Sequence, residues 1–135
     1  MLSATQVRAN FGQFIDDVVR SKPQIVKRNR DTIIAFSQAY LKDALSIYEL
    51  TFEYEQGEDG RYVGSIEQIT DIIADGETLD ELRKELAYQL IDYAEDYYND
   101  FERYNSYSNR KEHSNYILRV LLEDDIESVA SMLHG

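Results

Sequence analysis

The sequence predicts an α+β protein in two parts: a small helix–hairpin–helix segment over residues 1–45, and a β-β-β-α-β segment with a C-terminal helix over residues 46–135. Two observations predict this division. The spacing of apolar residues changes between helical and alternating patterns within each part. The charge also changes sign. Residues 1–45 carry seven Lys or Arg and four Asp, a net of +3, whereas the other ninety carry seven Lys or Arg and 22 Asp or Glu, a net of −15.

The composition excludes several classes of protein. With 135 residues, of which 43% are hydrophobic, the chain can fold as one domain or as two small ones. It has no cysteine, which excludes disulfides, thiolate zinc sites and cysteine nucleophiles. It also has no run of eighteen apolar residues and no apolar leader, so we expect neither a membrane span nor secretion. A cytoplasmic location fits these observations.

The N-terminal segment begins with a predicted helix. Ser3 and Gln6 have the Ser-x-x-Gln spacing of a capping box, in which each side chain satisfies a backbone N–H of the other residue. Apolar residues then follow at helical steps, at Val7, Phe11, Phe14, Ile15 and Val18. We expect one helix that ends before Pro23, which cannot continue it.

A hairpin and a second helix are predicted next. Gln24–Lys27 and Thr32–Phe36 are short and rich in β-branched residues, which is typical of two strands joined by a turn. Gln38–Leu45 follows as a short helix. A segment of about 45 residues is too small to be comfortably stable alone, and such domains need disulfides, metals or oligomerisation. Because the first two are absent, we expect this segment to form a dimer.

Cations gather at the hairpin turn. Lys27, Arg28 and Arg30 fall within four positions, and Thr5 and Arg8 lie on the predicted first helix, whose N-terminus is a natural place for a phosphate. This pattern favours a nucleic-acid contact. A solvated hairpin turn with no partner is the simpler alternative.

Three sequence blocks in this segment carry a family resemblance. They are Ser3-Ala4-Thr5-Gln6-Val7-Arg8-Ala9-Asn10-Phe11, then Ile25-Val26-Lys27-Arg28-Asn29-Arg30-Asp31, then Phe36-Ser37-Gln38-Ala39-Tyr40 with Leu45. Together they resemble the N-terminal domain of the Phd/YefM antitoxins. The resemblance implies a dimeric module that binds operator DNA and represses its own genes. It implies that Arg8, Lys27, Arg28 and Arg30 face the DNA. With Ser3 and Thr5 at the start of the predicted helix, these residues are the expected DNA-binding set. Family members begin with a short strand, for which this chain has only Met1 and Leu2.

The acidic segment begins with three predicted strands. In Ile47–Glu55, Tyr48, Leu50, Phe52 and Tyr54 alternate with polar residues, which indicates a half-buried strand. Arg61–Ile66 returns after a Gly-containing turn, and Ile69–Ala74 is the third strand.

A long helix follows the strands. Thr78 and Glu81 form a second capping box, and one helical face then carries Leu79, Leu82, Leu86, Leu90, Tyr93 and Tyr97. We expect Tyr116–Leu122 to be a fourth strand and Asp124–Leu133 to be a short helix.

This second segment resembles a HicB-type antitoxin domain. The residues that carry the resemblance are Glu58-Asp59-Gly60-Arg61-Tyr62-Val63 in the first hairpin and Asp75-Gly76-Glu77-Thr78-Leu79 before the helix. The Pro-rich, Gly-Cys segment usual in that family is replaced by Glu67-Gln68-Ile69-Thr70-Asp71. The resemblance implies a domain that holds a toxin. The division would then be residues 1–45 for DNA binding and dimerisation, and residues 46–135 for toxin binding.

The sequence favours no catalytic site. The adjacent carboxylate pairs Asp16/Asp17, Glu58/Asp59 and Asp124/Asp125 cannot share one face of a helix or strand, which makes them poor metal clamps. We expect His113 and His134 to be ordinary surface residues. No glycine-rich phosphate loop is present. We therefore predict no enzyme, no metal and no cofactor.

A tyrosine-rich stretch is the better candidate for a partner surface. Tyrosine is enriched at protein interfaces, and acidic neighbours complement a cationic partner. The predicted partner-binding residues are Tyr97, Tyr98, Tyr104, Tyr107, Asp96, Asp100 and Glu102. Part of this stretch is expected to be core, and the rest could be a solvated helix end.

The sequence thus predicts an antitoxin of a type II toxin–antitoxin system. It would neutralise a basic toxin, expected to be a ribonuclease, and repress its own operon as a dimer. The first alternative is a DNA-binding transcriptional regulator with an acidic domain that senses a ligand or protein. The second is a nuclease or other hydrolase. The toxin's identity and the operator sequence are not predictable from this chain.

Overall fold

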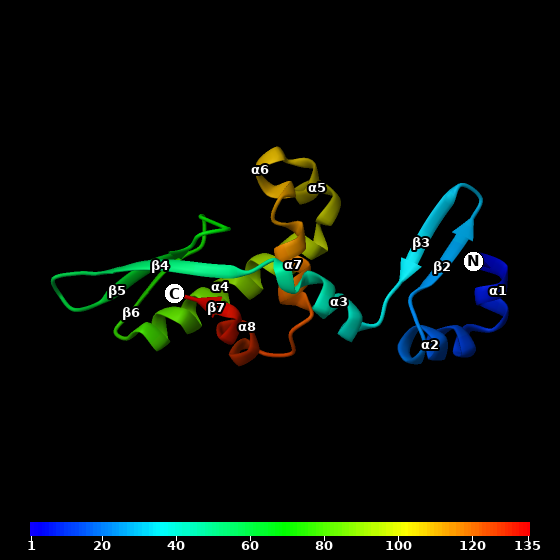
Figure 1. The fold of residues 1–135 in the computed structure, drawn as a ribbon. Coiled ribbons are helices and arrows are strands. Elements are labelled where there is room, and N and C mark those ends of the chain that lie inside the picture. The colour runs from blue at the N-terminus through cyan, green and yellow to red at the C-terminus, as the bar shows by residue number, and fades with distance from the viewer. The chain divides into compact units, whose positions relative to one another are not determined.

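The computed structural model describes all residues 1–135, which divide into two compact units (Figure 1). We call Met1–Ala44 the head and Leu45–Gly135 the body. The net charge changes sign at the same boundary. All the charged residues that give residues 1–45 a net charge of +3 lie within the head. The molecule contains no helix with both the length and the apolar character to cross a membrane.

The head is a three-stranded sheet with helices. Its elements are β1 (Leu2–Ser3), α1 (Ala4–Ala9), α2 (Phe11–Arg20), β2 (Gln24–Arg28), β3 (Asp31–Ala35) and α3 (Gln38–Ala44). The sheet order is β1-β2-β3, with β1 parallel to β2 and β2 antiparallel to β3. The predicted hairpin is confirmed, and so is the short helix after it.

The first predicted helix is two helices. Its capping box is confirmed, because the Gln6 backbone N–H donates to Ser3 Oγ at 3.1 Å and the Ser3 N–H donates to Gln6 Oε1 at 2.8 Å. The helix then breaks at Asn10, whose backbone angles are φ −134° and ψ 53°. The expectation of one helix was wrong because the apolar step from Val7 to Phe11 fits an unbroken turn. The break is a non-helical backbone conformation at one residue, Asn10, and it does not change the spacing of the apolar residues.

The head has almost no core. Only Val18 and Val26 are buried in it. Its exposed large apolar side chains are Met1, Phe11, Ile15, Val19, Ile25, Ile33, Ile34, Phe36 and Tyr40. The 44-residue head thus exposes nine large apolar side chains and buries only two. So small a core is not enough to stabilise a domain of this size on its own.

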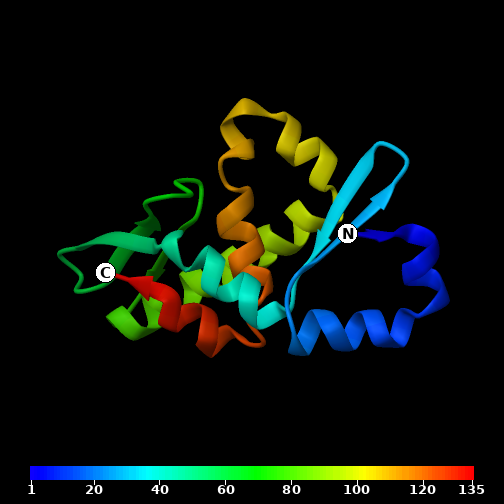
Figure 2. The same cartoon turned by 45° about the vertical axis from the view of Figure 1, so that its right-hand side comes forward.

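The body has its own sheet and most of the helices. Its elements are η1 (Leu45–Ile47, a 3₁₀ turn), β4 (Leu50–Gln56), β5 (Tyr62–Ile66), β6 (Ile73–Gly76), α4 (Leu79–Asn99), α5 (Phe101–Ser106), α6 (Ser108–Lys111), α7 (Ser114–Leu121), α8 (Ile126–Met132) and β7 (Leu133–His134). The sheet order is β6-β5-β4-β7. Figure 2 shows α5 and α6 as the yellow-to-orange arch that leads from α4 to α7.

The three-stranded meander is confirmed, but its third strand begins later than expected. Ile69 and Ile72 are buried in a turn before β6, closed by the Ile66 N–H donating to the Ile72 carbonyl at 3.1 Å. Ile69 and Ile72 therefore pack into the core from a turn and not from a strand. The predicted strand Ile69–Ala74 was wrong over its first four residues for this reason.

The predicted fourth strand, Tyr116–Leu122, was wrong. This stretch lies in helix α7, where Ile117 and Val120 are buried at helical spacing. A short apolar run fits either structure, and packing against α4 decides it here. The fourth strand of the sheet is β7, which pairs in parallel with the start of β4 through Leu50 and Leu133.

The core lies between the sheet and α4. The predicted leucine stripe is confirmed, since Leu82, Leu86, Leu90 and Tyr97 are fully buried. Thr78 caps the helix, because its hydroxyl oxygen accepts from the Glu81 N–H at 3.1 Å. The Glu81 carboxylate accepts from the Glu77 N–H, and not from the Thr78 N–H as a complete capping box requires. The opposite face of the sheet carries exposed Glu53, Glu55, Val63, Ile73 and Asp75.

Candidate functional site

The predicted DNA-facing residues all lie exposed on the head. Ser3 caps α1, Thr5 is in its first turn and Arg8 is in its last. Lys27 and Arg28 end strand β2, and Arg30 lies in the hairpin turn beside Asn29, whose φ of 56° suits an asparagine.

The sheet register brings part of this set together. Ser3 pairs directly with Lys27 across the parallel strands β1 and β2, so the N-terminus of α1 lies beside the cationic end of the hairpin. Because neighbouring strand residues point to opposite faces, Lys27 and Arg28 lie on opposite faces of the sheet. Arg28 is opposed by Asp31 across the hairpin. The arrangement is a basic rim next to a helix N-terminus.

Two apolar surfaces accompany this rim. Ile25 and Ile34 face each other across the hairpin and remain 41% and 50% exposed. On α2, exposed Phe11, Ile15 and Val19 recur every fourth residue and form a stripe along one helix face. Apolar patches of this kind mark interaction sites.

Tyr97, predicted as a partner-binding residue, belongs to the core. It is 0% exposed, and its hydroxyl donates to the Arg110 carbonyl at 2.9 Å. Its ring stacks on Tyr104 with centroids 5.1 Å apart, and Tyr104 is itself half-buried. The prediction of Tyr97 as a contact residue was wrong, because continuing the leucine stripe placed its ring under α5.

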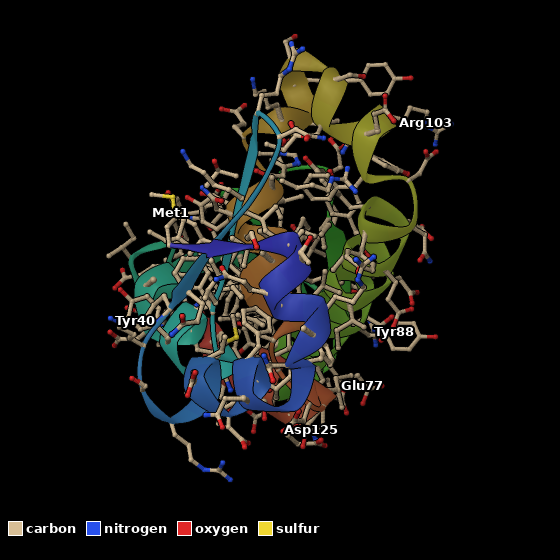
Figure 3. The ribbon with its side chains drawn as sticks, turned by 90° about the vertical axis from the view of Figure 1, so that its right-hand side faces the viewer. Met1, Tyr40, Glu77, Tyr88, Arg103 and Asp125 are labelled. Atoms are coloured by element: carbon tan, nitrogen blue, oxygen red, sulfur yellow. The ribbon has the colours of Figure 1, made fainter.

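The other residues of that set are accessible. Tyr98 and Tyr107 are 61% and 50% exposed, and Asp96, Asp100 and Glu102 are exposed as well. Asp100 pairs with Arg103 at 2.8 Å. Figure 3 shows Tyr88 and Arg103 projecting outward from α4 and α5. The accessible part of the predicted surface is therefore Tyr98 and Tyr107 with three carboxylates.

Sequence reasoning missed a buried polar network in the body. His113, expected to be an ordinary surface residue, is only 8% exposed. Its Nδ1 lies 2.8 Å from the Tyr93 hydroxyl, which accepts from Arg110 Nη1 at 3.2 Å. Arg110 also pairs with Asp71. Nothing in the spacing of these four residues indicates the network, since the fold brings them together from three segments.

Burial sets the protonation states of this network. It lowers the pKa of His113, and the nearby Arg110 charge lowers that pKa further. Burial raises the pKa of the Tyr93 hydroxyl despite its hydrogen bond from Arg110. The ring of His113 and the hydroxyl of Tyr93 are therefore both neutral near pH 7.

Three residues of the network, Asp71, Arg110 and His113, line an open cleft of about 600 Å³. One wall comes from the turn between β5 and β6, and the other from α6 and the start of α7. The lining residues are Tyr48, Glu67, Gln68, Thr70, Asp71, Asn109, Arg110, Glu112, His113 and Tyr116. Its size lies within the range of ligand-binding clefts, which is roughly 300–1,000 Å³.

Three of the carboxylates weighed as metal clamps have structural roles. Asp16 pairs with Arg20 at 2.8 Å, and Asp17 accepts from Gln13 Nε2 at 2.8 Å. Asp125 caps α8, and the hydrogen bond from the Ser128 N–H lowers its pKa. No group of three or more His, Asp or Glu side chains is placed to hold a metal ion.

Comparisons with known proteins give a consistent result. Residues 1–135 match the model of a family described as PHD-like, antitoxin of toxin-antitoxin, RelE / RelB, TA system. A solved crystal structure from Syntrophomonas wolfei subsp. wolfei, described as an antitoxin part of a proposed toxin/antitoxin system, is 41% identical with a TM-score of 0.92. That similarity covers 98% of this chain and 95% of the other. No curated protein matches the chain.

Proposed function

Because the chain belongs to this family of antitoxins, we propose that it neutralises a cognate toxin by direct binding and represses its own operon by binding operator DNA. The observation that carries the proposal is the division of charge between two structural units. The head has a net charge of +3 and the body −15. One unit suits phosphates and the other suits a basic protein.

The body is the proposed toxin-binding unit. A strongly acidic surface speeds the encounter with a basic partner and discriminates against acidic ones. Exposed Tyr98 and Tyr107 supply the large amphipathic contacts typical of interfaces, and Asp96, Asp100 and Glu102 surround them with negative charge. The action proposed is binding alone, without catalysis, and a basic ribonuclease is the expected partner.

The head is the proposed DNA-binding unit and acts as a dimer. A second copy would cover the apolar side chains that the head leaves exposed, and would double the number of cations at the rim. The basic residues Arg8, Lys27, Arg28 and Arg30 would contact phosphates, and the N-terminus of α1 with Ser3 and Thr5 would add backbone donors.

Co-expression tests the toxin-binding half. The full chain carries an affinity tag, and the untagged product of the neighbouring reading frame is expressed with it. Copurification, together with restored growth when the neighbour alone arrests growth, is the expected result. A neighbour that neither copurifies nor affects growth would contradict the assignment.

Operator binding tests the other half. We expect Arg28→Ala with Arg30→Ala to weaken binding to the upstream DNA. The slope of log affinity against log salt should become shallower by roughly 0.9 for each phosphate that the variant no longer neutralises. Arg20→Ala is the control, because it removes an exposed cation of the head that is paired with Asp16. Equal affinity of the double variant and the control would remove the hairpin from the DNA site.

One observation favours a second function. The cleft in the body has the size of a small-ligand site, as expected of a regulator that senses a ligand through its acidic domain. Such a regulator would bind the upstream DNA but would neither capture the neighbouring gene's product nor restore growth. The co-expression experiment therefore separates the two functions.

A further inference from the structure

The hydrogen bonds of Tyr93 favour one position for the ring proton of His113. The guanidinium of Arg110 can only donate, so the Tyr93 oxygen accepts from it. The single hydroxyl proton of Tyr93 is then available for His113 Nδ1, which lies 2.8 Å away. When Tyr93 donates to Nδ1, the proton of the neutral His113 ring lies on Nε2.

This Nε2–H group has no acceptor within the protein. Nδ1 makes the only hydrogen bond of the ring, while the side chain as a whole is 8% exposed and lines the cleft. Arg83 Nε is the buried side-chain nitrogen that lacks a partner, so His113 Nε2 is open to water in the cleft. An acceptor atom that enters the cleft, such as a carbonyl oxygen, would accept from Nε2 in place of that water.

The rim of the cleft is negatively charged. Three carboxylates line it, from Glu67, Asp71 and Glu112, against one guanidinium from Arg110. Asp71 is already paired with Arg110, and Glu67 accepts from Thr51 Oγ1 at 2.6 Å. Glu112 forms no ion pair. The unpaired carboxylate of Glu112 therefore favours the binding of a cation in the cleft.

Two tyrosines complete the lining. The rings of Tyr48 and Tyr116 meet edge to face with centroids 5.5 Å apart. Tyrosine faces attract cations, and the planar guanidinium of arginine stacks on them better than the ammonium of lysine does.

We infer that the cleft binds an arginine of the partner protein, with its guanidinium between the tyrosines and the carboxylate of Glu112 and a main-chain carbonyl beside it accepting from His113 Nε2. That this partner is the toxin rests on the proposed function. That the cleft binds an arginine rests only on the residues that line it. The occupant is a positively charged segment of another protein, which an acidic body attracts.

A short peptide tests the inference without the toxin. The probe is acetyl-Gly-Arg-Gly-amide, and the matched control is the same peptide with citrulline, which keeps the shape of arginine but lacks its charge. The full-length protein is labelled with ¹⁵N-histidine and observed by NMR. It has only two histidines, so exposed His134 serves as the internal reference.

Without peptide, we expect His113 to give the spectrum of a neutral ring protonated on Nε2. The arginine peptide should shift the Nε2 resonance of His113 and leave His134 unchanged, and the citrulline peptide should bind more weakly. Glu112→Gln should weaken the arginine peptide by about threefold to tenfold, as expected for a charged contact in a half-enclosed site. Glu58→Gln, an exposed carboxylate in the β4–β5 turn, should have no effect.

Several results would overturn the inference. They are a ring protonated on Nδ1, equal shifts with both peptides, no shift with either, or equal effects of the two glutamate substitutions. If the neighbouring gene's product copurifies while the peptide leaves His113 unchanged, the antitoxin function stands and the cleft assignment fails. If the peptide binds as expected but no neighbour copurifies, the cleft assignment stands and the proposed function fails.

Discussion

The head and the body of this molecule solve the problem of burying apolar surface in different ways. The body covers Leu82, Leu86 and Leu90 completely and builds a continuous core around α4. The head buries only Val18 and Val26 and leaves Ile33 63% exposed. The body therefore has the core of an independent domain, whereas the head has the surface of half a domain. The proposed dimer would therefore complete the folding of the head itself.

The largest expected effect comes from a substitution in the core of the body. Leu86→Ala should lower the free energy of unfolding of the body by about 2–5 kcal/mol, because it leaves a cavity in a fully buried place. Chemical denaturation followed by circular dichroism measures it. If the body is an independent domain, the decrease is the same at every protein concentration. A concentration-dependent midpoint for this transition would contradict the comparison.

A second substitution addresses the head. Ile34→Lys should weaken its dimer at least about tenfold, because it places an unpaired charge on a surface that a second copy would cover. Sedimentation equilibrium gives the dissociation constant. Ile73→Lys is the matched control, since Ile73 is similarly exposed but lies on the body. Unchanged dimerisation by Ile34→Lys would place the interface elsewhere on the head.

A smaller effect is expected at the cap of α4. Thr78→Ala removes the acceptor for the Glu81 N–H and should lower the free energy of unfolding of the body by about 1 kcal/mol. Thermal unfolding of the wild type and the variant at one concentration measures it. Thr78→Ser keeps the oxygen and should recover most of that stability. If serine and alanine behaved alike, the cap would not be the cause.

The last expected effect is a pH dependence within the body. Because burial lowers the pKa of His113, the unfolded chain binds a proton more readily than the folded one. Stability should therefore be complete above pH 6.5 and fall as the pH drops below it, by at most about 1.4 kcal/mol per pH unit from this residue. His113→Asn should flatten the curve between pH 6.5 and 5, as measured by urea unfolding. An unchanged curve would show that His113 does not carry the dependence.

Local features of the fold could be predicted from the sequence. The capping box of Ser3, the hairpin and the leucine stripe of α4 depend on residues a few positions apart. The errors fall where the pattern fits two structures. Tyr116–Leu122 is short and apolar enough to be a strand, and only packing against α4 makes it the helix α7. The break at Asn10 leaves the apolar spacing intact, so periodicity could not reveal it.

The sites were less predictable than the fold. The cations of the hairpin are adjacent in the sequence, so they could be identified, although their role remains a prediction. Tyr97 fits both a buried stripe and a tyrosine-rich interface, and the structure places it in the core. The cleft joins Tyr48, the turn at Glu67–Asp71 and the α6–α7 segment. No spacing rule connects residues so far apart in the chain.

The pairing of β7 with β4 has a consequence for the order in which the protein forms during synthesis. Leu50 and Leu133 lie near opposite ends of the body's sequence, so the ribosome must make nearly the whole body before its sheet can gain that fourth strand. The residues of the head come first in the chain, so the head leaves the exit tunnel before the body. Its apolar side chains are thus available to a second nascent chain while the body is still being translated.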